Sequence, residues 1–343
     1  AEAWGSGSEG ITGTSHTITM ADGAADAARA YSLTLTGSIT ALNTVTLAPN
    51  TVNKTWVIQN SSGYAVSLTQ GTGANVVIPN GGIKMVVADG AGAGAAVTDV
   101  LDMTGGTGNV GLGSGNLGTA LTTGTDNVAI GEASLDAVTT GDNNTAVGDN
   151  AAGATTTGSS NTAIGADALL LNSTASYNTA IGNDAMAANT TGAENTAVGW
   201  DALTANTTAS NNVAVGTTAL GANTTGTDNV AVGAYALDAN TTTSDNTAIG
   251  DNALGANTAD NNTAVGSSAL LANTTGTRNV GVGASALKTI TTASYNVGVG
   301  NDVLGANTTG ANNTGVGDQA LGANTTGTEN TAVGSAALDA NTT

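Results

Sequence analysis

From residue 109 onward the chain consists of one short unit repeated fourteen times, and this repeat limits what the chain can fold into. Eleven of the thirteen spacings between units are 17 residues, one is 18 and one is 16. Helical repeats need about 33 to 47 residues and leucine-rich repeats about 20 to 29, so neither fits. A 17-residue unit can instead form one coil of a parallel β-solenoid. Each unit begins with Asn, at 109, 127, 144, 161, 178, 195, 212, 229, 246, 262, 279, 296, 313 and 330.

The consensus N-[TV]-[AG]-[VIL]-G-x-x-A-L-x-A-N-T-T-[GA]-x-x indicates where the strands and turns of each coil belong. Positions one to four alternate with the two-residue period of a strand. The fifth position is Gly in every unit, which permits a bend or a positive φ. A second short strand is predicted over A-L-x-A, as in Ala236, Leu237 and Ala239, and Asn-Thr-Thr-Gly supplies turn chemistry. Stacked units place Asn over Asn, so side-chain amides can form ladders along the axis.

Two apolar positions are predicted to fill the coil interior, the aliphatic fourth position and the Leu of the ninth. With the fourth position inside, strand alternation places the third position outside, where every unit has Ala or Gly. A strip of such small side chains suits the close approach of another chain. The predicted coil-core residues are Val198, Leu203, Val232 and Leu237, and the predicted chain–chain contacts are Ala214, Ala231 and Ala248.

Burial within one coil is limited, because each coil contributes only about two large aliphatic side chains. This shortage favours an oligomer over a single solenoid. A monomeric solenoid with a tightly packed Ala row is the alternative.

The repeats also carry a family resemblance. Asn127-Val-Ala-Ile-Gly131, Asn195-Thr-Ala-Val-Gly199 and Asn212-Val-Ala-Val-Gly216 resemble the repeated motif of trimeric autotransporter adhesin heads. The longer form NTAVGxxALxANTTGxxN resembles repeats of phage tail fibres and other long bacterial surface proteins. The resemblance covers residues 109–343 and implies a homotrimer of left-handed parallel β-rolls. The usual adhesin repeat is shorter than the unit of this chain.

Residues 1–103 do not repeat and predict a separate β-domain, joined by a Gly/Thr linker at 104–108 to the solenoid at 109–343. Short strands with turn signals at Asn60-Ser-Ser-Gly63 and Pro79-Asn-Gly-Gly82 predict an antiparallel β-sandwich or small barrel. The run from Lys54 to Asn60, with the segments that follow it, resembles small β-domains of phage tail-fibre proteins. The strands are expected at 16–20, 31–40, 44–47, 54–60, 65–70, 75–78 and 84–88.

Composition excludes several function classes. The chain has 5 basic and 25 acidic residues, a net charge of −20, which argues against nucleic acid and anionic membranes as partners. It has no Cys, hence no disulfide or thiolate metal site, and a single His, His16. No apolar run is long enough for a transmembrane helix, and the first residues do not form a signal peptide. We therefore expect no enzyme, no cofactor, no metal site and no membrane insertion.

Some residues of the repeats remain candidates for a ligand surface. Acids at the sixth and seventh positions, such as Asp184 and Asp201, lack the regular register of calcium-binding repeats and predict a solvated, repulsive surface. A glycosidase pair among these acids is a weaker alternative.

The Asn-Thr-Thr units match the pattern of N-glycosylation acceptors, but turn chemistry alone explains why this pattern occurs in the repeats. The large aromatics of the array are candidates for a ligand patch, and isolated surface aromatics are the plainer interpretation: Trp200, Tyr235, Tyr177 and Tyr295.

These observations predict a non-enzymatic, rod-like structural fibre of a virion, such as a phage tail fibre, that contacts a host-surface glycan or protein receptor. Other virion or fibre proteins are expected to bind the N-terminal region. The alternative is a bacterial trimeric surface adhesin or extracellular filament subunit, located outside the cell or on its surface. The β-rich N-terminal domain and the absent signal peptide favour the virion.

Overall fold

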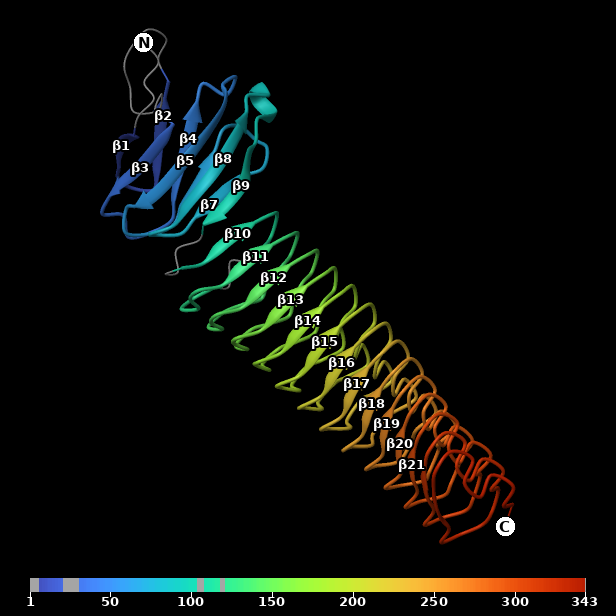
Figure 1. The fold of residues 1–343 in the computed structure, drawn as a ribbon. Helices are drawn as coiled ribbons and strands as arrows, with labels where there is room; N and C mark the ends of the chain where they lie inside the picture. The colour runs from blue at the N-terminus through green and yellow to red at the C-terminus, as the bar shows by residue number, and fades with distance from the viewer. Residues whose placement is uncertain (1–5, 21–30, 104–107, 118–120, 343) are drawn as a thin grey trace. The chain divides into compact units, whose positions relative to one another are not determined.

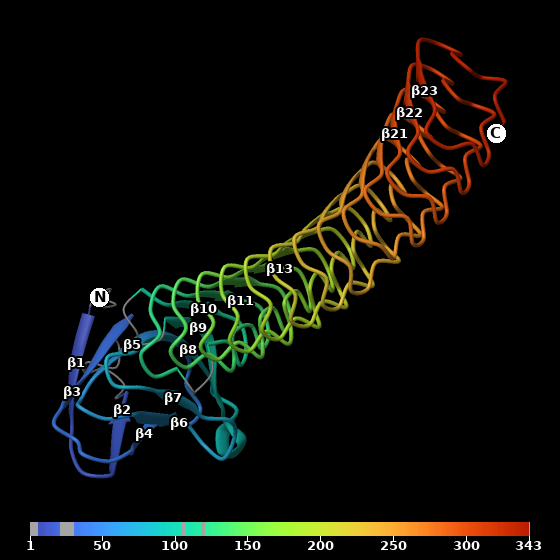
Figure 2. The same ribbon diagram turned by 90° about the horizontal axis from the view of Figure 1, so that it is seen from below.

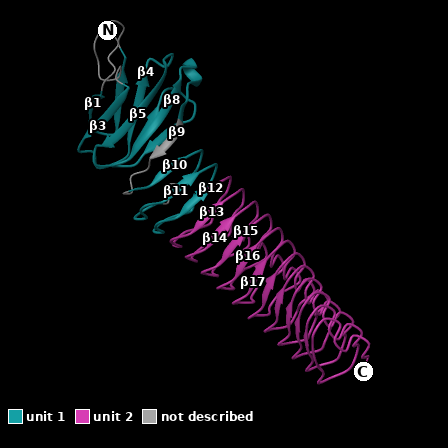
Figure 3. Cartoon of the chain, in the orientation of Figure 1, with its two compact units in different colours: residues 1–146 teal, residues 147–343 magenta. Residues whose placement is uncertain are grey.

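The computed structural model describes residues 6–20, 31–103, 108–117 and 121–342. The described chain is almost entirely β and turn, and its one regular helix is the short 3-10 helix η2 (Gly92–Gly94). It divides into two compact units, residues 1–146 and 147–343 (Figure 3). The linker expected at 104–108 lies outside the described residues apart from Gly108.

The N-terminal domain consists of strands in two sheets, seen at the blue end of the ribbon in Figure 1. The core lies between them and includes the buried side chains of Leu33, Leu35, Val45, Ile58 and Leu68. The first sheet contains β1 (Ser6–Ile11), β3 (Ser32–Gly37), β5 (Asn53–Ser61), β8 (Ile83–Asp89) and β9 (Val97–Met103). The second contains β2 (Ser15–Thr19), β4 (Asn43–Ala48), β6 (Val66–Thr69) and β7 (Val76–Ile78).

The strand directions in this domain differ from the predicted antiparallel sandwich. Strands β1, β3 and β5 pair in parallel, and so do β2, β4 and β6. Among the described strands of the domain, only β5–β8, β8–β9 and β6–β7 are antiparallel. The arrangement in two sheets agrees with the predicted sandwich, but the antiparallel pairing was wrong for the parallel pairs, because turn signals do not show whether a connection stays within one sheet. The turn after β5 and the turn after β7 instead carry the chain across to the opposite sheet.

In the repeat region, each unit contributes one three-residue strand, and these strands form a fourteen-stranded, all-parallel sheet. This arrangement confirms the predicted β-solenoid. The strands are β10 (Val110–Leu112), β11 (Val128–Ile130), β12 (Thr145–Val147), β13 (Thr162–Ile164), β14 (Thr179–Ile181), β15 (Thr196–Val198), β16 (Val213–Val215), β17 (Val230–Val232), β18 (Thr247–Ile249), β19 (Thr263–Val265), β20 (Val280–Val282), β21 (Val297–Val299), β22 (Thr314–Val316) and β23 (Thr331–Val333).

The register of the coil strands follows the repeat. Ala197 pairs with Ala214, and Ala214 pairs with Ala231, so equivalent positions stack. Figure 2 shows the successive coils of the array one after another. At the start of the coil array, the first coil strand β10 pairs antiparallel with β9, and Gly111 lies opposite Asp102. Because β10 is the first coil strand, β9 covers an edge that would otherwise expose unpaired backbone groups.

Gly at the fifth position ends each coil strand and is required there for two reasons. Gly216 has φ 135°, which disfavours residues with a side chain. A Cβ on Gly216 would also lie 2.5 Å from the carbonyl oxygen of Gly233 in the next coil. The same combination recurs from coil to coil and explains why the fifth position never varies.

Candidate interaction surfaces of the coil array

Two Asn ladders lie in the coil interior and decide which face of each strand points inward. The first-position Asn212 is buried, and its backbone N–H donates to Oδ1 of Asn195 at 2.9 Å. Its own Oδ1 accepts from the backbone N–H of Asn229 at 3.1 Å. At the twelfth position, Nδ2 of Asn206 donates to Oδ1 of Asn189 at 2.9 Å. The ladders thus pair buried amides that would be costly to leave unpaired.

The third position shares its face with the first-position Asn, since side chains alternate along a strand. Ala214, Ala231 and Ala248 are accordingly fully buried inside the coil, where they pack in the same interior as the ninth-position Leu. The prediction that this row forms a contact between chains is therefore wrong. No partner can reach it without opening the coil.

The predicted coil-core residues divide into two groups. Leu203 and Leu237 are fully buried, as expected. Val198 and Val232 are only half-buried, because the fourth position faces outward from the sheet. Their assignment to the interior is wrong, since the coil is too narrow to hold them beside the Asn, Ala and Leu that already fill it.

The outer face of the coil sheet is consequently aliphatic. The fourth position is Val, Ile or Leu in every unit, and Ile164 and Ile249 are 38% and 40% exposed. The second position, Thr or Val, lies on the same face and is half-buried along most of the array. Neighbouring strands are about 4.8 Å apart, so these side chains form two adjacent rows along the sheet. We call this surface the aliphatic face.

The predicted second strand over A-L-x-A is wrong, because the backbone is left-handed at the Leu of this segment and at the residue just before the segment. Tyr235 has φ 56° and Leu237 has φ 52°. The segment still bonds to both neighbouring coils, since the N–H of Tyr235 donates to Thr217 and that of Leu237 to Ala253. Hydrogen bonds that go alternately to the preceding and the following coil satisfy the backbone N–H groups, although no regular strand forms.

The sequence-predicted aromatics lie on two different rows. Trp200 and Tyr235 occupy the corner formed by the sixth and seventh positions, and they are 53% and 42% exposed. Tyr177 and Tyr295 occupy the last position of their units and are also exposed. The ring of Tyr295 lies beneath Arg278 of the preceding coil, and Nη1 of Arg278 donates to its hydroxyl at 2.8 Å.

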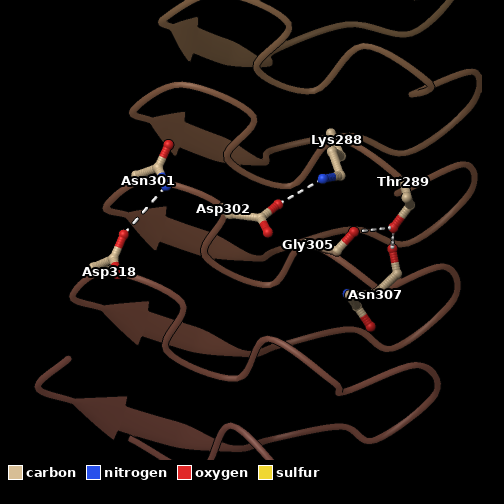
Figure 4. Close-up of polar contacts among 7 residues, drawn as sticks. All are labelled: Lys288, Thr289, Asn301, Asp302, Gly305, Asn307 and Asp318. Carbon is tan, nitrogen blue, oxygen red and sulfur yellow. Dashed lines mark hydrogen bonds and ion pairs between the residues drawn. The ribbon is translucent and has the colours of Figure 1, made fainter. Parts of the chain in front are cut away.

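One irregular coil replaces ladder bonds with other contacts. In the unit that begins at Asn279, Lys288-Thr289-Ile290 stands where most coils have x-Ala-Asn. Nζ of Lys288 lies 2.7 Å from Oδ1 of Asp302, and Oγ1 of Thr289 donates to the carbonyl oxygens of Gly305 and Asn307 (Figure 4). Both side chains thereby hold the irregular coil to the next one.

The acids of the array lie on its surface, and within the described residues no group of three or more potential ligands is placed to hold a metal ion. Burial, together with the neighbouring carboxylate of Asp184, raises the pKa of Asp201 above its usual value. In the N-terminal domain, His16 contacts Glu9, with Nε2 and Oε1 2.9 Å apart. This contact was not foreseen, because the two residues lie on different strands.

The Asn-Thr-Thr sites are structural. Their Asn side chains belong to the twelfth-position ladder and are buried, so an attached glycan would not fit inside the folded coil. The buried acceptor-like residues are Asn189, Asn206, Asn223, Asn240, Asn307 and Asn324.

In the described part of the chain, no helix has the length and apolar character needed to cross a membrane. Comparisons with protein-family models, with curated proteins and with solved structures found no match.

Proposed function

We propose that this chain is a structural fibre protein of a virion, similar to a phage tail fibre, that acts as a spacer and attaches the particle to a host surface. The aliphatic face is the observation that carries the proposal. A solvent-facing sheet normally carries polar side chains outward, whereas this one repeats an aliphatic residue in coil after coil. A long apolar strip of this kind marks an interaction surface.

The partner we propose for the aliphatic face is two further copies of the same chain. Three coil arrays around one axis would bury all three strips against each other, and closed symmetry would leave no unmatched strip to promote aggregation. Obligate interfaces between identical chains are typically this apolar. The interior of each coil needs no help from a partner, since the Asn ladders and the Leu row already fill it.

The resemblance of the repeats to adhesin heads and tail fibres supports a fibre made of three chains. The N-terminal domain, with its own core, is the part we propose to contact other virion or fibre proteins. A host-surface glycan or protein is the proposed receptor. A trimeric adhesin on a bacterial surface is the alternative location for the same architecture.

Immunogold labelling with antibodies raised against the whole chain tests the proposal. Gold on the appendages of purified virions is the expected result. Gold confined to the envelope of the producing cells would overturn the virion assignment in favour of the adhesin. Native mass spectrometry tests the assembly separately, and the expected mass is three times the 32.6 kDa of one chain.

A further inference from the structure

Trp200 and Tyr235 stand on one corner of the coil array, two coils apart. The carbonyl oxygen of Trp200 accepts from the N–H of Thr218 at 2.9 Å, and that of Thr217 accepts from the N–H of Tyr235, also at 2.9 Å. These two bonds join three successive coils through their sixth and seventh positions. At about 4.8 Å for each coil, the two aromatic residues are about 10 Å apart along the axis.

This corner is otherwise lined by small or polar side chains. The sixth and seventh positions carry residues such as Asn183, Thr217 and Ala234, and within the coil array Trp200 and Tyr235 are their only aromatics. Half of the Trp200 side chain is exposed (53%), although a Trp normally covers itself with protein. Both rings therefore offer flat apolar surface to solvent with hydroxyls between them.

The polar groups around the two rings favour a neutral, hydroxyl-rich ligand. The Thr217 and Thr218 side chains are half-buried between the two aromatic coils and can donate or accept hydrogen bonds. Asp201 follows Trp200 directly, and Asp184 stands at the same position one coil earlier. Their carboxylates accept from hydroxyl groups and repel anions.

We propose that the corner formed by Trp200, Thr217, Thr218, Tyr235 and Asp201 binds a neutral oligosaccharide that lies along the coil axis. One sugar ring stacks on Trp200 and another on Tyr235, because the apolar face of a sugar ring suits an aromatic surface. The carboxylate of Asp201 and the threonine hydroxyls bond the sugar hydroxyls between them. The inference rests on the proposed attachment function and specifies its receptor as a neutral glycan.

Saturation-transfer NMR with the full chain tests this inference, using maltohexaose, cellohexaose and mannohexaose as probes. We expect at least one hexasaccharide to bind with a Kd of about 1 mM or tighter. The corresponding disaccharide should bind more weakly, because it cannot reach both rings. Trp200→Ala and Tyr235→Ala should each weaken binding by about tenfold or more.

Tyr177→Ala and Tyr295→Ala are the matched controls, since they remove exposed rings from a different row. They should leave binding unchanged. Absence of binding by all three hexasaccharides, or equal loss in the control variants, would overturn the inference. Salt-sensitive binding of hexalysine without any saccharide binding would also overturn it and indicate a cationic partner instead.

Measuring both mass and saccharide binding on the same samples distinguishes failure of the glycan site from failure of the proposed fibre assembly. A trimeric mass without saccharide binding would refute the glycan site and leave the assembly standing. Saccharide binding by a monomer would support the site and contradict the assembly.

Discussion

Oδ1 of Asn273 is buried without a hydrogen-bond partner, because Ile290 stands at the ladder position of the next coil. In the regular coils, the twelfth-position Asn donates through Nδ2 to the Asn of the coil before it, as Asn206 does to Asn189. Ile290 has no amide, so the ladder stops at Asn273 and resumes between Asn307 and Asn324. The site is a natural defect in the ladder that joins Asn273 to Asn257.

The first prediction repairs this defect. Ile290→Asn should supply the missing donor and raise the free energy of unfolding by about 1 kcal/mol, the usual net value of such a bond. Thermal unfolding followed by circular dichroism provides the measurement. Ile290→Val is the control, which shortens the side chain without adding a donor and should destabilise. A loss of stability in Ile290→Asn equal to that in Ile290→Val would show that the ladder does not govern this position.

The second prediction removes a ladder residue that is fully bonded. Asn212→Ala should leave the buried N–H of Asn229 without its acceptor and cost about 2 kcal/mol or more. Asn301→Ala removes a similar amide on the exposed side, where it donates to Asp318 (Figure 4). That change should stay within about 0.5 kcal/mol. Equal effects in urea unfolding would contradict the placement of the ladder inside the coil.

The third prediction concerns size matching in the interior. Val303 occupies a position that is Ala in most coils, and a Cβ on Gly315 would lie 2.7 Å from its Cγ2. Gly315→Ala should therefore destabilise by about 1–3 kcal/mol through overpacking. In a Val303→Ala background, the same change should cost far less.

Gly281→Ala is the comparison for this cycle, since its nearest contact would be an ordinary 3.4 Å. It should be tolerated in the wild-type background. Additive effects of Gly315→Ala and Val303→Ala would show that the two side chains do not compete for the same space.

The fourth prediction uses the raised pKa of Asp201. Burial and the carboxylate of Asp184 raise the pKa of Asp201 in the folded chain, so the folded state holds this proton more tightly than the unfolded state. The contribution of protonated Asp201 to the stability of the fold is present below the unfolded pKa of 3.8. It is lost as the pH rises through the folded pKa. Asp201→Asn should therefore raise the melting temperature at pH 7 and lose this advantage below pH 3.8. Asp251→Asn controls for the removal of one charge, and an equal gain at pH 7 in that variant would contradict the local explanation.

Much of the coil could be predicted from the sequence, because the repeat length excludes other repeat folds and invariant Gly216 and its equivalents mark the ends of the strands. Which face of the strand points inward was predicted incorrectly. The larger side chain of Val232 was assigned to the interior by its hydrophobicity, although a narrow coil has space only for Ala231. The signal was available, since Asn229 and Ala231 share a face and the Asn ladder needs a water-free interior.

Other features depend on tertiary pairing and had no local signal. The left-handed backbone at Leu237 is unusual for Leu and is maintained by bonds to the neighbouring coils. The parallel pairing of β1, β3 and β5 could not be deduced from the turns between strands, because a turn of similar composition can join strands within one sheet or across two. The exposure of Trp200 and Tyr235 was expected from the variable positions that they occupy, but the bonds that join their coils through Thr217 and Thr218 had no signal in the sequence.

Native mass spectrometry of the wild-type chain and of a Val215→Lys, Val232→Lys variant tests the central claim most directly. The two changes place charges on the outward aliphatic face and leave the coil interior untouched, so the variant should remain folded. The wild-type chain should have three times the mass of one chain, and the variant should be a monomer with an unchanged circular dichroism spectrum. A wild-type chain that is monomeric at micromolar concentration, or a variant that still forms the trimer, would contradict assembly through this face.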